Sequence, residues 1–93
     1  MSLKQIKSGD LVISTAGIDK DRVFLVVDVF ENRAKIVDGK SRKVTCPKLK
    51  NIKHLKEIDV DGLSQTATDI KNGNPVGNKR LKREIAKKFK RED

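Results

Sequence analysis

The sequence has few aromatic residues. It contains no tryptophan or tyrosine, and its three phenylalanines are Phe24, Phe30 and Phe89. Proteins that bind single-stranded nucleic acid usually offer aromatic side chains on which the bases stack. We expect Phe24 and Phe30 to lie in the core, so the scarcity of aromatic residues argues against this mode of binding.

Residues that commonly carry chemistry are also scarce. Cys46 is the only cysteine and His54 the only histidine. A single cysteine excludes an internal disulfide and a cysteine-based zinc cluster. A thiol nucleophile would need the side chains of Cys46 and His54 to lie close together. We expect Cys46 to be a small core residue in a strand. No glycine-rich phosphate loop and no calcium-loop spacing of aspartates is present. We therefore expect no enzymatic activity, no catalytic residues, no metal and no cofactor.

The chain has no long apolar run. No stretch approaches the roughly 18 apolar residues of a membrane span, and residues 1–7 lack the apolar segment of a signal peptide. Only 35% of the 93 residues are apolar and 38% are charged, which predicts a small core and one domain with an appendage. We expect a cytoplasmic monomer that does not contact membranes.

Positive charge is what the chain has in excess. Lysine and arginine number 22 against 13 acidic residues, and the net charge of +9 suits a polyanionic partner. Residues 40–56, the basic block, hold seven basic and no acidic residues. The alternative is a solvated strand edge, since lysines also protect exposed strands from aggregation. We favour binding because no acidic residue accompanies the block.

Short apolar segments joined by turn signals predict a mostly β fold. The expected strands are residues 11–14, 22–30, 33–37, 43–46 and 52–58. Glu31-Asn32 and Asp38-Gly39 are two-residue hairpin signals, and Gly17 lies in a loop where we expect a positive φ. In the longest strand, one face carries Val23, Leu25, Val27 and Val29, and the other carries Phe24, Val26, Asp28 and Phe30. Five short strands favour an SH3-like barrel over a sandwich.

The composition changes after Ile58, and two helices are expected there. Ser64 or Asp61 would cap the first, which carries Leu63, Ala67 and Ile70. Asn78 would cap the second, residues 79–91, whose apolar stripe is Leu81, Ile85 and Phe89. We expect this stripe to cover the Phe24 face of the longest strand. The domains are then a barrel over residues 1–58 and a packed helical tail over residues 59–93. The polar face of the second helix is basic, and whether it is merely solvated or binds a partner stays open.

The segment Val27-Asp28-Val29, followed by Asn32-Arg33-Ala34 and Val37-Asp38-Gly39, resembles the KOW motif. It is similar to bacterial KOW-domain RNA-binding proteins and to the KOW domain of the archaeal and eukaryotic large-subunit ribosomal protein fourteen-e. The similarity continues through Arg42-Lys43 and Pro47-Lys48 to Lys50-Asn51-Ile52-Lys53-His54-Leu55, and covers about residues 5–58. One position departs from the pattern, because Asp21 stands where the family usually has glycine after the loop lysine.

The resemblance implies an SH3-like barrel that binds RNA, with ribosomal RNA, ribosomal proteins and the translation machinery as partners. The alternatives are a protein-binding KOW module and a duplex-DNA binder. Phosphates are the expected contacts, since phosphate contacts position a protein on nucleic acid. The candidate RNA-binding residues come from the loop over residues 15–22 and from the basic block: Thr15, Gly17, Lys20, Arg22, Lys40, Arg42, Lys43, Lys48, Lys50, Lys53 and Lys56.

Overall fold

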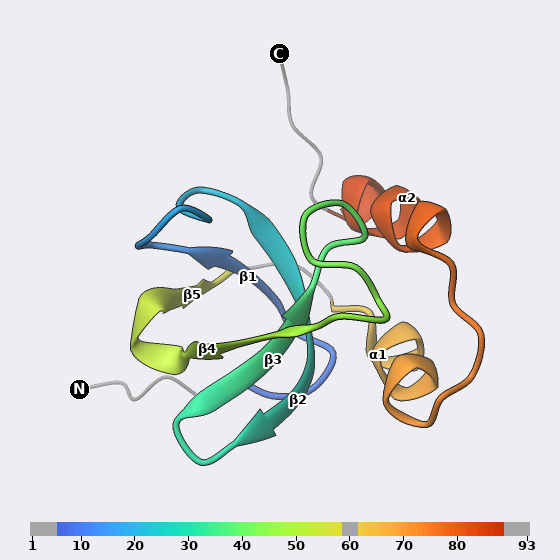
Figure 1. Ribbon diagram of the computed structural model, residues 1–93, viewed down its shortest axis with the longest axis horizontal. Coiled ribbons are helices and arrows are strands. Elements are labelled where there is room, and N and C mark those ends of the chain that lie inside the picture. The colour runs from blue at the N-terminus through green and yellow to red at the C-terminus, as the bar shows by residue number, and fades with distance from the viewer. Residues whose placement is uncertain (1–5, 59–61, 89–93) are drawn as a thin grey trace.

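The protein is a five-stranded antiparallel sheet followed by two helices (Figure 1). The computed structural model describes residues 6–58 and 62–88. The elements are β1 Leu11–Ser14, β2 Val23–Phe30, β3 Arg33–Val37, β4 Lys48–Asn51, the 3₁₀ helix η1 Ile52–His54, β5 Leu55–Glu57, α1 Ser64–Lys71 and α2 Asn78–Lys88. The strand order is β4-β3-β2-β1-β5, so the structure is mixed but dominated by its sheet. Within the described ranges, no helix is both long and apolar enough to cross a membrane.

The sheet curves, but it does not close into the predicted barrel. β4 and β5 form its two edges, and no strand pairing joins them in the described part of the chain. Part of the reason lies just after β4. The predicted strand 52–58 begins instead as η1, whose first turn is capped by the Asn51 side chain accepting from the Lys53 N–H at 3.0 Å. Only Leu55–Glu57 is left to pair with β1.

A register shift in β2 changes which side chains share a face. Val26 pairs with Ile36 and Asp28 pairs with Lys35, so Val27 is an extra residue in the ladder. Beyond this bulge the alternation reverses. Val29 consequently packs with the Phe24 side of the sheet, and Phe30, which was expected in the core, is 46% exposed. The predicted division of the strand into two faces is therefore correct only as far as Val27.

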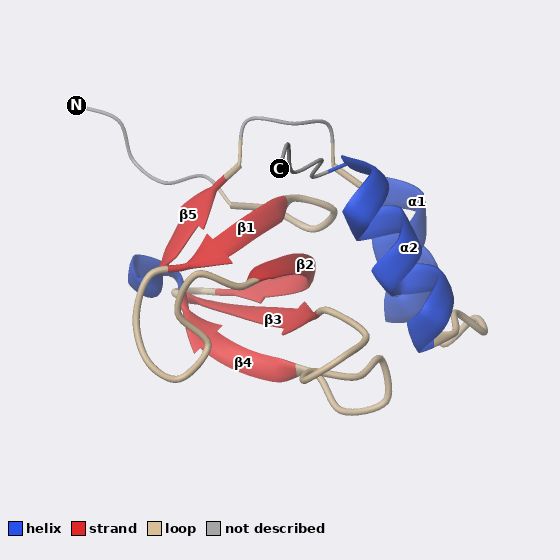
Figure 2. Ribbon diagram, turned by 90° about the horizontal axis from the view of Figure 1, so that it is seen from above, coloured by secondary structure: helices blue, strands red, loops and turns tan. Residues whose placement is uncertain are grey.

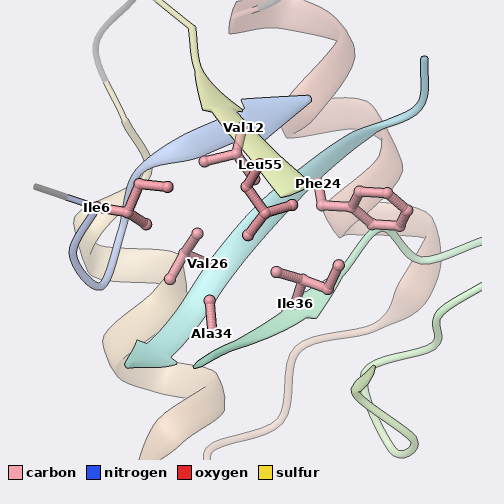
Figure 3. Close-up of a cluster of buried hydrophobic side chains, with 7 residues drawn as sticks. All are labelled: Ile6, Val12, Phe24, Val26, Ala34, Ile36 and Leu55. Atoms are coloured by element: carbon pink, nitrogen blue, oxygen red, sulfur yellow. The ribbon is translucent and has the colours of Figure 1, made fainter. Parts of the chain in front are cut away.

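Two apolar clusters lie on the two faces of the sheet. The inner cluster fills the concave side and consists of Ile6, Val12, Phe24, Val26, Ala34, Ile36 and Leu55 (Figure 3). The outer cluster joins the sheet to both helices and consists of Leu11, Leu25, Val27, Val37, Ala67, Leu81 and Ile85. Burial of each large side chain contributes about 1.5–3 kcal/mol.

The helices cover the Leu25 face of β2, not the Phe24 face that the sequence predicted. Leu81 and Ile85 of α2 belong to the outer cluster with Leu25 and Val27. The Phe24 face is already filled from the concave side of the sheet, so it has no room for a helix. Phe89 lies outside the described residues. The same is true of residue 59, where the predicted helical tail begins.

The predicted strand over residues 43–46 does not form. The connection from β3 to β4 runs over residues 38–47, and β4 begins only at Lys48. Within the connection, the Val44 N–H donates to Asn78 Oδ1 at 2.8 Å and the Cys46 N–H donates to the Lys43 carbonyl at 2.9 Å. These bonds occupy amides that a strand would use in a ladder. Cys46 is exposed in this connection, so its predicted place in the core is wrong.

The helix ends differ from the predicted caps. Ser64 is the first residue of α1, and Leu63 precedes it without a side-chain capping bond. Asp61 lies outside the described residues. Asn78 is the first residue of α2, and its side chain ties the helix to the β3–β4 connection through Val44. The predicted stop at the end of α1 is confirmed, because the helix ends at Lys71 and Gly73 has φ +82°.

Candidate nucleic-acid interface

The loop Thr15–Arg22, here called the display loop, lies across the gap between the two edge strands (Figure 2). On the β5 side, the Thr15 N–H donates to the His54 carbonyl at 2.8 Å. On the β4 side, Lys50 Nζ donates to the Ala16 carbonyl at 2.7 Å. The display loop is therefore hydrogen-bonded to both edges of the sheet.

Asp19 fixes the display loop to the basic block. Its side chain is 4% exposed, and its Oδ2 lies 2.9 Å from Lys48 Nζ and 3.2 Å from an Arg42 guanidinium nitrogen. Burial by itself raises the pKa of Asp19. The hydrogen bonds and positive charges of Lys48 and Arg42 together outweigh burial, so the pKa lies below 3.8. The carboxylate is thus ionised at neutral pH and holds two cations in place.

The basic block does have an acidic partner, contrary to the sequence-based expectation. Asp19 comes from a distant part of the sequence and neutralises part of the charge of Arg42 and Lys48. Lys50 is buried, with 9% exposure, and its ammonium is used on the Ala16 carbonyl. Arg42, Lys48 and Lys50, which were predicted to contact RNA, consequently support the display loop. The display loop and the basic block are in contact, as these bonds show.

Backbone conformation in the display loop agrees with the glycine prediction. Gly17 has φ +83°, which favours glycine. Asp21 has φ +72°, and its N–H donates to the Ser14 carbonyl at 2.8 Å. Aspartate tolerates this left-handed region better than most residues. The position at which the KOW pattern has glycine therefore keeps a positive φ in this chain.

A second acidic residue shapes the connection after β3. Asp38 Oδ1 accepts from the backbone N–H groups of Lys40 and Arg42, each at 2.8 Å, and its Oδ2 accepts from the Ser41 hydroxyl at 3.0 Å. Arg22 of the display loop donates to Ser41 Oγ at 3.3 Å. The turn at residues 38–42 and the end of the display loop therefore lie side by side.

The exposed members of the predicted set surround these fixed loops. Lys20, Arg22, Lys40, Lys43, Lys53 and Lys56 are all exposed. Lys56 lies on β5 opposite Ile13, and Lys53 lies on η1, whose His54 carbonyl is bonded to Thr15. Thr15 is itself exposed. We call these six cations, with Thr15, the basic face.

Nothing in the described ranges forms a metal site: no group of three or more histidine, cysteine, aspartate or glutamate side chains is placed to hold an ion. Cys46 lies in the β3–β4 connection and His54 at the end of η1. The expectation that the protein is not an enzyme stays a prediction.

Sequence reasoning missed the organising carboxylates. Asp19 and Asp38 are bonded to groups within the protein, and these bonds set the shape of both loops. One pattern in the sequence could have indicated the Asp19 bridge: an aspartate in a short loop, and a cluster of cations without acidic residues elsewhere in the same small domain. Ile18 was missed as well. It lies next to Asp19 and is 88% exposed, so the display loop presents an apolar side chain to solvent.

Comparisons with known proteins do not assign a family. No protein-family model matches the chain, and no curated protein shows significant similarity to it. The resemblance to KOW domains thus depends on the residues quoted above.

Proposed function

We propose that this protein binds structured RNA, in the first instance ribosomal RNA, through the basic face. The observation that carries the proposal is the Asp19 bridge. It holds the display loop on β4 with a buried carboxylate, so that the surrounding exposed cations project from a backbone that is already ordered. An ordered backbone reduces the conformational freedom that is lost on binding.

The fold assignment that goes with this function is an open variant of the SH3-like barrel of KOW domains. A five-stranded antiparallel order with β5 beside β1 supports it, as does the display loop lying over the gap between the edges. Positive φ at Asp21, where the KOW pattern has glycine, also supports it. Association with the ribosome in the cytoplasm, without catalysis, is part of the proposal.

The mechanism is electrostatic recognition of folded RNA. Each cation that neutralises a phosphate releases condensed counterions, and this release drives binding. Phe24 is fully buried and cannot stack on a base. Phe30, expected in the core, is 46% exposed, but it lies at the end of β2 away from the display loop, with Lys35 Nζ 5.6 Å from its ring centroid. Base stacking is therefore not part of the proposed mechanism. Shape and phosphate spacing would then select the RNA, as is common for double-stranded or folded RNA.

The test compares variants by charge and position. Lys20→Gln with Lys43→Gln removes two exposed cations from the basic face without touching the Asp19 bridge. We expect weaker binding to large-subunit ribosomal RNA and a salt slope shallower by about 2. The matched control is Arg33→Gln with Lys35→Gln, which removes two charges from β3 on the face that carries Phe30. Equal losses in both pairs would refute a localised basic face.

A protein-binding KOW module is the second candidate, because Ile18 is 88% exposed at the display loop. An apolar side chain on a fixed loop can anchor a protein partner. Ile18→Ser separates the two functions. Unchanged RNA affinity together with lost binding to ribosomal proteins would favour the second candidate. A preference for duplex DNA over RNA at equal salt would instead identify a DNA-binding protein.

A further inference from the structure

A hollow lies at the edge of the basic face, beside Arg22 and Lys40. It has a volume of about 240 Å³ and lies where the start of β2, the turn at residues 38–42 and α2 meet. Its lining residues are Arg22, Val23, Asp38, Lys40, Lys82, Ile85 and Ala86. Figure 1 shows the β3–β4 connection, drawn in green, reaching the α2 side of the molecule.

Three cations from three separate elements line this hollow. Arg22, Lys40 and Lys82 are all exposed. The one acidic residue in the lining is Asp38, which is 9% exposed and whose two oxygens accept from Lys40, Ser41 and Arg42. The hollow is therefore positively charged at its rim, and its one carboxylate is hydrogen-bonded within its own turn.

The position of Lys82 is set by close packing of α2 on the turn. A Cβ added at Gly39 would lie 3.0 Å from Lys82 Cγ and would also collide with the Asn78 carbonyl. Gly39 has φ +79° as well, so only glycine fits there without strain. The Asn78–Val44 hydrogen bond fixes the same contact from the helix side. The first part of the Lys82 side chain is consequently held against the turn that carries Lys40.

The less exposed part of the lining is apolar and forms the floor of the hollow. Val23 is half-buried and Ile85 is anchored in the outer cluster, with the exposed Ala86 beside them. A shallow apolar floor with a cationic rim fits a nucleotide, whose base or sugar can lie on the floor while its phosphate meets the cations.

We propose that this hollow seats one nucleotide of the bound RNA, with Lys82 of α2 contacting its phosphate together with Arg22 and Lys40. The inference rests on the proposed RNA-binding function and extends it to the helical tail. It gives the basic helix a specific role that packing alone does not require, since Leu81 and Ile85 already dock the helix.

The test uses the full chain and large-subunit ribosomal RNA at about 0.1 M monovalent salt. Loss of one phosphate contact corresponds to a fivefold to eightfold loss of affinity, by a slope of about 0.7–0.9 per phosphate. We expect this loss for Lys82→Gln, together with a salt slope shallower by about 1. The control is Lys87→Gln, which makes the same charge change on the same helix but lines a different hollow, beside Ser64 and Thr66. It should bind RNA as the unchanged protein does.

A second measurement locates the contact directly. In a titration of isotope-labelled protein with RNA, the backbone amide signals of Gly39, Lys40 and Lys82 should shift with the same apparent affinity as those of the display loop. If Lys82→Gln binds like the unchanged protein and these amides do not shift, the hollow is not a nucleotide site even though RNA binding stands. If the unchanged protein does not bind RNA, the proposed function itself fails.

Discussion

At the scale of single residues, Asp19 connects fold and function. Its carboxylate is buried between the display loop and the start of β4, and two half-buried cations, Arg42 and Lys48, converge on it. A buried charge is stable only when it is paired and hydrogen-bonded. The same residue therefore stabilises the sheet and fixes the loop that the proposed function needs.

Replacing Asp19 by asparagine keeps the size of the side chain and removes its charge. Arg42 and Lys48 then lose their common partner, and we expect the free energy of unfolding to fall by about 2 kcal/mol. Urea denaturation measures this. Asp21→Asn is the matched control in the same loop, since Asp21 is exposed and asparagine tolerates its positive φ. Equal stability of the two variants would show that the bridge contributes nothing.

The β2–β3 hairpin contains a residue in an unfavourable conformation. Glu31 has φ +51°, in the region that favours glycine. Glu31→Gly should therefore raise the free energy of unfolding by about 0.5–1 kcal/mol, because relief of the strain exceeds the entropy that glycine adds to the unfolded chain. Asn32→Gly is the control. Only Glu31 of the two turn residues has a positive φ, so the control should be neutral or destabilising, and a larger gain from it would contradict this account.

At the scale of elements, local pattern predicted the fold where neighbouring residues decide the structure. Strands β1 and β3 have the predicted bounds, β2 begins one residue later than predicted, and both helices lie close to their expected positions. Errors arose where distant contacts decide. Asn78 occupies the Val44 amide and prevents a strand at residues 43–46. The bulge at Val27 moves Phe30 outward, and no residue type in β2 marks it.

In the candidate site, too, features set by neighbouring residues were predictable and features set by distant contacts were not. Its cations were predictable because they cluster in the sequence, and the display loop was predictable from Gly17. Which cations face solvent was not, because Asp19 lies more than 20 residues from Arg42 and Lys48 in the chain. Only the fold brings that carboxylate to the block.

The helical tail is expected to unfold together with the sheet. Leu81 is fully buried in the outer cluster with Leu25 and Val37. Leu81→Ala should lower the free energy of unfolding by about 3 kcal/mol, and the sheet and helix signals should shift together in one transition. Lys79→Ala, at an exposed position of the same helix, is the control and should change stability little. Loss of the helix signal with an unchanged sheet transition would make the tail an independent unit.

At the scale of the whole molecule, two carboxylates link stability to pH. The pKa of Asp19 is lowered as described. The Thr66 hydroxyl, followed by Arg80, lowers the pKa of Glu84 below 4.5 against the opposing effect of burial. Both groups bind protons more tightly in the unfolded chain. Their stabilising effect is therefore complete above about pH 5 and is lost as the pH falls through their lowered folded-state values.

This linkage is measured by comparing urea midpoints at about pH 6 and about pH 3. The unchanged protein should lose more stability over this interval than the double variant Asp19→Asn with Glu84→Gln, which has neither carboxylate to protonate. The general repulsion among the basic residues acts in both proteins and cancels in the comparison. Equal losses would contradict the lowered pKa values.

The proposed function requires that the basic face bind RNA through its phosphates. Its most direct test is the salt dependence of binding to large-subunit ribosomal RNA, measured from low ionic strength upward. With six exposed cations on the face, several phosphate contacts are expected. The logarithm of the association constant should then fall with the logarithm of salt concentration at a slope between about −3 and −5. Absence of binding at low salt, or a slope near zero, would contradict the account.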